Sequence, residues 1–262
     1  MNPFELAHSA LMSCNIDEKI ELTNKLYFDS LNEDLNYKIN HHLHKIKEPG
    51  RPSKPNLVRF QNVPKRDNSD AGMIKTIHAI CHIEFNAINL ALDSVYRFRS
   101  MPEKFYKDWI RVAFEEAKHF KLINNYFNEL GYNYGDFSAH NGLWTMTYET
   151  DYDVLSRIAL VPRVLEARGL DVTPKIQKKF KNSKFTKMSD ILDIIFADEI
   201  GHVKIGNYWF NSLCKQRGLE PLNTFDKLLK KHVGPKLRGP FNFEARKLAD
   251  FSQTELDYLI SS

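Results

Sequence analysis

The chain contains two Glu-x-x-His pairs, a spacing that places a carboxylate and an imidazole one helical turn apart on one face. The stretch FEEAKHFKLI holds Glu116 and His119, and the stretch FADEIGHVKIG holds Glu199 and His202. Apolar residues lie at helical offsets around each glutamate, so both pairs fall on the most apolar face of an expected helix. Carboxylates and imidazoles that point inward at this spacing are typical of metal ligands in helical proteins.

Each pair is preceded by a lone glutamate, at nearly the same distance along the chain. Glu84 precedes the first pair and Glu166 precedes the second, and each lies among apolar residues at helical offsets. The chain therefore carries a two-helix unit twice: a helix with an inward glutamate, then a helix with an inward Glu-x-x-His. Packed antiparallel, the two units predict a four-helix bundle in which four carboxylates and two imidazoles converge.

Such a cluster requires positive charge. Ionised carboxylates in a core are costly and repel one another, and two divalent cations would remove both penalties. The ferritin-like di-iron and di-manganese proteins follow the same pattern, with one Glu from each of two helices and Glu-x-x-His from the other two. We therefore predict two iron ions, with manganese possible, and no organic cofactor; the sequence identifies no catalytic residue beyond the metal ligands, and whether others exist stays unknown. The predicted ligands are Glu84, Glu116, His119, Glu166, Glu199 and His202.

Other polar residues near these positions have alternative interpretations. Asp198 could orient a ligand histidine from a neighbouring helix, or it could be a surface residue. Arg163, one turn before Glu166, could support that ligand or line a pocket. Glu115 has Arg111 and Lys118 at helical offsets, which favours a solvated ion pair over metal binding.

The elements that must position these residues are almost all helical, since strand-like alternation is scarce. We expect an all-α, ferritin-like four-helix bundle with helical extensions at both ends. The expected domains are an N-terminal arm and linker at 1–70, the di-metal bundle at 71–217, and a C-terminal extension packing on the bundle at 218–262. Turn signals include 131–142 and 168–174. The expected helices lie at about 3–12, 16–31, 71–99, 103–130, 151–168, 174–183, 188–216, 223–232 and 254–261.

Composition narrows the class of protein. A chain of 262 residues with 42% hydrophobic residues can bury a sizeable core, and the net charge of +4 does not by itself imply nucleic acid. No apolar run is long enough to span a bilayer, and the N-terminus lacks the basic start of a secretory signal. Three widely spaced cysteines argue against a disulfide framework. We therefore expect a cytoplasmic protein without a membrane partner.

Several stretches resemble a bacterial ferritin-like family catalogued as a domain of unknown function. The similarity covers nearly the whole chain and is strongest from about residue 70 onward. It implies the di-iron carboxylate superfamily, distantly similar to tRNA-hydroxylating di-iron monooxygenases, with metal ligands at the six positions named above. The family has no agreed reaction, so the resemblance implies a fold and a metal rather than a substrate. The stretches are HAICHIEFNAINLALD (78–93), EEAKHF (115–120), YGDFSAHNGLW (134–144), LVPRVLEARGLDVTP (160–174), DEIGHVKIGNYWF (198–210) and GPFNFEARKLADF (239–251).

Sites of this kind activate dioxygen or peroxide. We expect an iron-dependent oxidase or oxygenase, a monomer or small homo-oligomer, acting on an unknown small molecule or RNA with an electron donor possible. The alternatives are iron handling, manganese-dependent peroxide disproportionation, and hydroxylation of tRNA or a nucleotide. Residues 175–187 carry six lysines and no acid, and residues 227–239 are also basic. Both segments could hold phosphates, although thin aromatic interleaving favours a solvated basic face.

Overall fold

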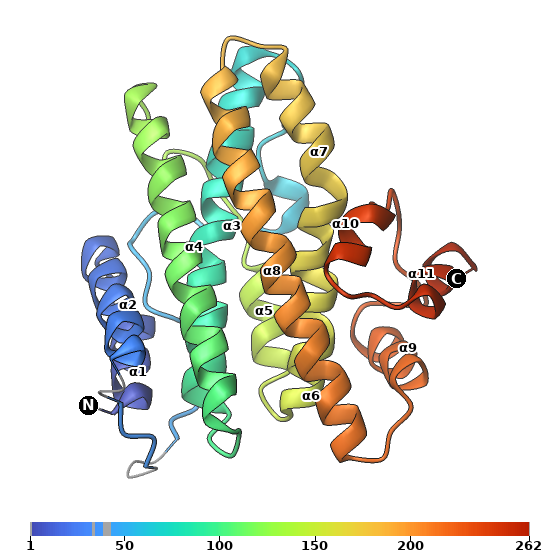
Figure 1. Ribbon diagram of the computed structural model, residues 1–262. Coiled ribbons are helices and arrows are strands. Elements are labelled where there is room, and N and C mark those ends of the chain that lie inside the picture. Colours follow the sequence, from blue (N-terminus) through green and yellow to red (C-terminus); the bar gives the residue numbers. More distant parts are fainter. Residues whose placement is uncertain (1, 33–34, 39–42, 262) are drawn as a thin grey trace. The chain divides into compact units, whose positions relative to one another are not determined.

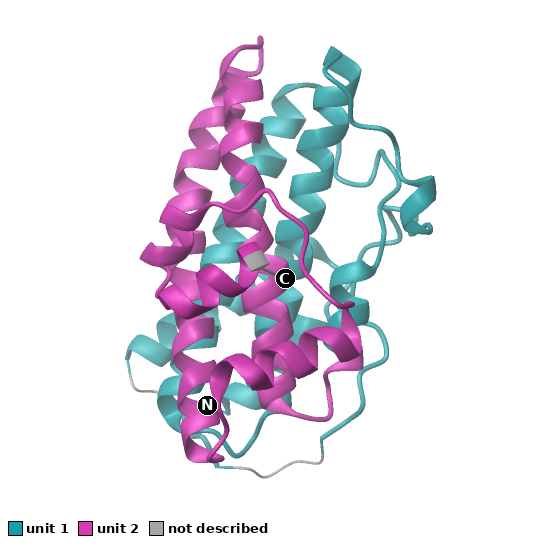
Figure 2. Cartoon of the chain, turned by 90° about the vertical axis from the view of Figure 1, so that its right-hand side faces the viewer, with its two compact units in different colours: residues 1–148 teal, residues 149–262 magenta. Residues whose placement is uncertain are grey.

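The computed structural model describes residues 2–32, 35–38 and 43–261. Every regular element in these ranges is a helix, so the predicted all-α class is confirmed for the described residues (Figure 1). The chain divides into two compact units, residues 1–148 and 149–262 (Figure 2). The ferritin-like four-helix bundle and the domain limits at residues 70 and 217 stay predictions.

The first unit is built around two long helices joined by a short connection. The helix α3 packs against α4, and the N-terminal helices cover this pair, α1 on α3 and α2 on α4. The predicted helices at 3–12, 16–31, 71–99 and 103–130 are confirmed to within two residues. The elements are α1 (Pro3–Met12), α2 (Ile16–Leu31), η1 (Phe60–Asn62), α3 (Asp70–Arg97), α4 (Glu103–Glu129) and α5 (Gly142–Glu149).

Local signals explain where these helices begin. The Ser69 hydroxyl accepts the Gly72 N–H at 3.1 Å and caps α3, while α4 begins directly after Pro102. The short α5 was not predicted from the sequence. It is held in part by Trp144, whose indole Nε1–H donates to the Lys47 carbonyl at 2.8 Å, a contact with a distant segment.

A buried lysine ties the N-terminal helices to α3. The Lys19 Nζ donates to the carbonyls of Ala10 and Leu11, at 2.7 and 2.8 Å, and to Asn89 Oδ1 at 2.8 Å. The two carbonyls lie at the end of α1, where a helix lacks backbone donors of its own. Burial lowers the pKa of Lys19 to about 7. The residue fixes the N-terminal arm on the helix that carries Glu84.

The second unit repeats the two-helix arrangement and adds C-terminal helices. The helix α7 packs along α8, and η2 contacts both. Short helices α9, α10 and α11 follow, of which α10 was not predicted. The elements are α6 (Val154–Leu160), the π-helical segment η2 (Val161–Glu166), α7 (Ala167–Lys181), α8 (Thr186–Gln216), α9 (Pro221–His232), α10 (Phe243–Leu248) and α11 (Gln253–Ser261).

The predicted turn at 168–174 is wrong, because α7 runs through it with Pro174 inside the helix. A proline removes the N–H that would bond the carbonyl four residues earlier, here that of Leu170. The side-chain amide of Asn242 donates to this carbonyl instead, at 3.2 Å. A contact with the C-terminal segment thus compensates for the missing backbone donor.

The predicted helix at 151–168 is also modified. It begins at Val154, after Asp153, whose carboxylate accepts the Ser156 N–H at 3.1 Å. Around Pro162 the chain widens into η2, and the Ala167 N–H donates to the carbonyl of Pro162, five residues earlier. Glu166 is the last residue of this π-helical segment, a type of element that recurs at functional sites.

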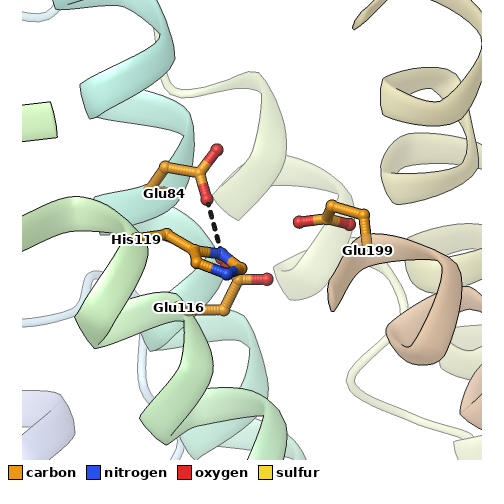
Figure 3. Close-up of side chains that lie close together, drawn as sticks. All are labelled: Glu84, Glu116, His119 and Glu199. Atoms are coloured by element: carbon orange, nitrogen blue, oxygen red, sulfur yellow. Dashed lines mark ion pairs between the residues drawn. The ribbon is translucent and has the colours of Figure 1, made fainter. Parts of the chain in front are cut away.

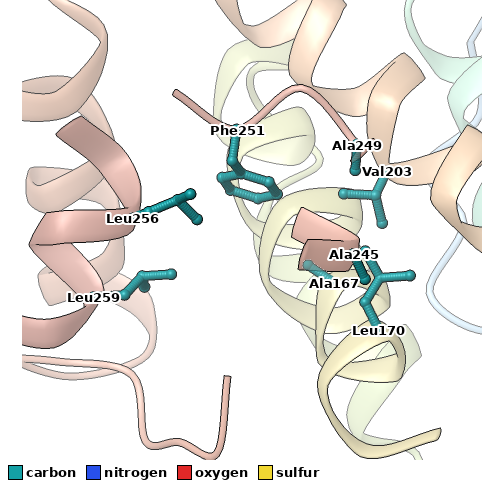
Figure 4. Packing of buried hydrophobic residues seen from close by; sticks show 8 residues of the cluster. All are labelled: Ala167, Leu170, Val203, Ala245, Ala249, Phe251, Leu256 and Leu259. Carbon is teal, nitrogen blue, oxygen red and sulfur yellow. The ribbon is translucent and has the colours of Figure 1, made fainter. Parts of the chain in front are cut away.

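The C-terminal helices pack on α7 and α8 through an apolar cluster within the second unit. Phe251 and Leu256 belong to one buried cluster with Val203 of α8 and Leu170 of α7. Figure 4 shows this packing among Ala167, Leu170, Val203, Ala245, Ala249, Phe251, Leu256 and Leu259. In the described part of the chain, no helix combines the length and the apolar character needed to cross a membrane.

Candidate metal centre

In the first unit, three of the predicted ligands lie between α3 and α4. Glu84 projects from α3, and Glu116 and His119 project from α4 one turn apart (Figure 3). Their side chains are almost fully buried, with exposed fractions of 5% for Glu84 and 0% for the other two. The inward orientation predicted for these three residues is therefore confirmed.

The three side chains converge on one point. The Nδ1 of His119 lies 3.3 Å from Oε2 of Glu84 and 3.4 Å from Oε2 of Glu116. One donor atom from each residue lies within 4.8 Å of the other two. Neighbouring ligands of one metal ion are about 3 Å apart when each bond is about 2.1 Å. The distances from His119 to the two carboxylates are close to this spacing.

The chemical types of these donor atoms also fit a metal ion. Two carboxylate oxygens and one imidazole nitrogen suit iron or manganese, whereas a structural zinc site favours a closed tetrahedron, often with thiolates. Cys81, one turn before Glu84, is buried, and burial raises the pKa of its thiol. The side chains of Ile88 and Phe120 are among the buried apolar groups on the same helices. A buried Glu/His cluster that could hold a metal ion is therefore present in the first unit.

In the second unit, the other predicted Glu-x-x-His pair lies on α8. His202 is fully buried, and its Nδ1 lies 3.7 Å from Oε1 of Glu199, whose side chain is 13% exposed. Glu166 is half-buried at the end of η2, and η2 packs against α8. The structure therefore pairs Glu199 with His202 and places Glu166 on the adjoining element of the same unit.

Arg163 is fully buried in η2. Its Nε donates to Asn207 Oδ1 at 2.6 Å, its Nη2 pairs with Glu255, and its guanidinium lies 3.9 Å from the centre of the Phe210 ring. Burial lowers the pKa of Arg163 to about 10, while Glu255 opposes that shift. These contacts join η2 to α8 and α11, the two elements on which its partners lie.

Sequence reasoning missed the partners of Arg163. Asn207 and Glu255 lie 44 and 92 residues away, and no local pattern connects them to it. Asp198 is half-buried on α8, and its suggested role in orienting a histidine stays a prediction. Glu115 forms an ion pair with Arg111 at 2.9 Å, as its helical spacing predicts.

Comparison with known proteins identifies a family for this chain. A family model described as "Protein of unknown function (DUF455)" matches residues 12–257. The chain belongs to this family. An uncharacterised protein from Haemophilus influenzae is 45% identical over 267 residues, covering 98% of this chain and 93% of the relative. No solved structure matches the chain.

Membership of the DUF455 family agrees with the resemblance seen in the sequence motifs. The matched range contains all six predicted ligands, and the family description names no reaction. The wider grouping with ferritin-like proteins rests on the motifs and on the repeated Glu and Glu-x-x-His pattern, and it stays a prediction.

Proposed function

We propose that this protein is a ferritin-like di-iron oxidase or oxygenase with one dinuclear carboxylate–histidine centre per chain. In this proposal Glu116 and Glu199 would contribute to the binding of both metal ions. Glu84 with His119 would hold one ion, and Glu166 with His202 would hold the other. The observation that carries the proposal is the convergence of Glu84, Glu116 and His119 at 3.3–3.4 Å in a buried position.

The repeat supports extending the site to a second metal ion. Glu199 and His202 have the same spacing on α8 as Glu116 and His119 have on α4. One divalent ion balances the charge of two carboxylates, so four carboxylates call for two ions. We propose that the predicted ligands of both units belong to one cluster.

The residues of the chain have defined tasks in such a centre. The glutamates would supply negative charge to the metal ions, and the imidazoles would add neutral nitrogen donors. Buried apolar neighbours such as Ile88 and Phe120 keep water away from the donors. Bound iron would supply the electrons for reduction of dioxygen.

Three alternatives use the same ligands and stay open. Iron handling and manganese-dependent peroxide disproportionation require no organic substrate. Hydroxylation of tRNA or a nucleotide would require phosphate contacts, for which the exposed Lys178, Lys181 and Lys184 near the end of α7 are candidates. The same lysines are equally consistent with a solvated surface.

The deciding experiment is metal analysis of protein purified without metal loading. We expect about two metal ions per chain in the natural protein and almost none after combined Glu116→Ala and Glu199→Ala substitution. Glu115→Ala is the matched control, because it also removes a carboxylate from α4. The Glu115 carboxylate forms an ion pair with Arg111 and is not a predicted metal ligand.

Circular dichroism should confirm that both variants remain helical. Stoichiometric metal in the double variant would disprove the dinuclear centre, and equal metal loss in Glu115→Ala would show that the effect is not specific to the ligands. Anaerobic reduction of the natural protein followed by exposure to oxygen then separates oxygen activation from simple metal binding.

A further inference from the structure

A cavity of about 130 Å³ lies in the first unit, on a different set of α3 residues from Glu84. Its walls come from α3, from the segment that precedes this helix, and from the chain that leads into α5. Apolar side chains dominate the lining, among them Val63, Ile83, Phe137 and Leu143. Ile83 is 46% exposed, which is unusual for a large apolar side chain in a helix of this core.

The polar lining of the cavity is basic. Arg66 and Lys75 both line it, and the lining residues include no aspartate or glutamate. Burial lowers the pKa of the His140 imidazole, and the positive charge of Arg66 lowers it further. An apolar cavity with two cations and no acid among its walls is electrostatically complementary to an anion.

Two histidines of the lining are neutral and accept backbone hydrogen bonds. His78 Nε2 accepts the Gly135 N–H at 3.0 Å, and His140 Nδ1 accepts the Gly142 N–H at 3.1 Å. A neutral imidazole that accepts on one nitrogen carries its proton on the other. Burial lowers the pKa of both rings, that of His78 to about 4, although Asp136 partly opposes the shift at His78. The positive charge therefore belongs to Arg66 and Lys75.

We propose that this cavity binds a small organic carboxylate, with the carboxylate at Arg66 and Lys75 and an apolar body against Ile83 and Phe137. The guanidinium fork matches a planar carboxylate. The volume of the cavity limits the size of the apolar part of the ligand, since an engineered protein cavity of about 150 Å³ accepts benzene. The site is independent of the candidate metal ligands, and its test does not depend on metal.

Binding to the full-length protein is measured by calorimetric titration with benzoate and cyclohexanecarboxylate. The neutral isostere benzamide and the more highly charged phenyl phosphate are titrated in parallel. We expect saturable binding of at least one carboxylate and about tenfold weaker binding of benzamide, because a charge-assisted hydrogen bond is lost. No binding of either carboxylate would overturn the proposal, and so would tighter binding of phenyl phosphate.

Substitutions in the cavity lining test whether the carboxylate binds there. Combined Arg66→Gln and Lys75→Gln substitution should weaken carboxylate binding by about tenfold or more. Ala79→Leu, which adds volume to a residue of the lining, should also weaken it. Lys65→Gln is the control, because it removes the same charge from an exposed neighbour outside the lining. Unchanged affinity in the double variant, or an equal loss in Lys65→Gln, would contradict the assignment.

Discussion

At the scale of single residues, His78 shows how burial couples protonation to folding. The ring is 1% exposed and accepts the Gly135 N–H, a bond that requires a neutral Nε2. Burial lowers the pKa of His78 from 6.5 to about 4. Between these values the unfolded chain binds more protons than the folded chain. The stability that neutral His78 contributes is therefore fully present above pH 6.5 and is lost as the pH falls toward 4.

We predict that His78→Gln reduces the loss of stability between about pH 7 and about pH 5. The glutamine oxygen can accept the same N–H and does not titrate. Urea unfolding at both pH values measures the difference, and the exposed His44→Gln serves as the control. An identical pH dependence in the His78 variant and the natural protein would refute this account.

At the scale of elements, the close approach of η2 and α8 depends on one glycine. A Cβ at Gly206 would lie 2.5 Å from the Cβ and 2.7 Å from the Cγ of Pro162. The proline ring cannot rotate away, so the two elements would have to separate. Because η2 ends at Glu166, this contact helps to set the position of a predicted ligand relative to α8 within the second unit.

Gly206→Ala should therefore destabilise the protein by about 1–3 kcal/mol, the usual cost of overpacking a core. Gly201→Ala is the matched control on the same helix, where an added Cβ meets nothing within 4 Å. That substitution should stabilise the protein by up to about 1 kcal/mol, because alanine favours a helix over glycine. Urea midpoints measure both effects. Equal effects of the two substitutions would rule out the packing explanation.

At the scale of the whole molecule, bound metal should contribute to the stability of the fold. A ligand that binds only the folded chain adds stability by mass action, about 4 kcal/mol when free metal is a thousandfold above Kd. Chelation should lower the Tm of the natural protein at neutral pH. Mild acid should partly restore the stability of the metal-free form, because protons then neutralise the clustered carboxylates.

Differential scanning calorimetry with and without chelator measures this change. The Glu116→Ala and Glu199→Ala double variant is the control, since its Tm should not respond to the chelator. A natural protein whose Tm is unchanged after verified removal of metal would contradict the prediction.

A second prediction at this scale separates an enzyme from a storage protein. In the first unit, α1 packs on α3 and α2 packs on α4, so part of the surface of this pair is already occupied within the chain. We predict a monomer or small oligomer that does not accumulate a mineral core. Size-exclusion chromatography and aerobic iron titration test it together. A large shell that holds hundreds of irons would reject the oxidase or oxygenase proposal.

The sequence by itself determined most helices and the inward direction of the predicted ligands. Periodicity alone places Glu84, Glu116 and His119 on apolar faces, because a helix repeats every 3.6 residues whatever surrounds it. Their burial in α3 and α4 agrees with that prediction. The pairing of Glu199 with His202 and that of Glu115 with Arg111 each lie within one turn of a single helix, so the sequence spacing alone predicts both.

Contacts between segments that are far apart in the sequence were decided only by the tertiary structure. Asn242 bonds the carbonyl of Leu170 and lets α7 continue through Pro174, against the local turn signal. Arg163 forms an ion pair with Glu255, which lies far along the chain. Arg66 and His140 come from two separate segments and line the same cavity. Such contacts depend on which surfaces meet after the helices form, and a pattern within one helix carries no information about its partners.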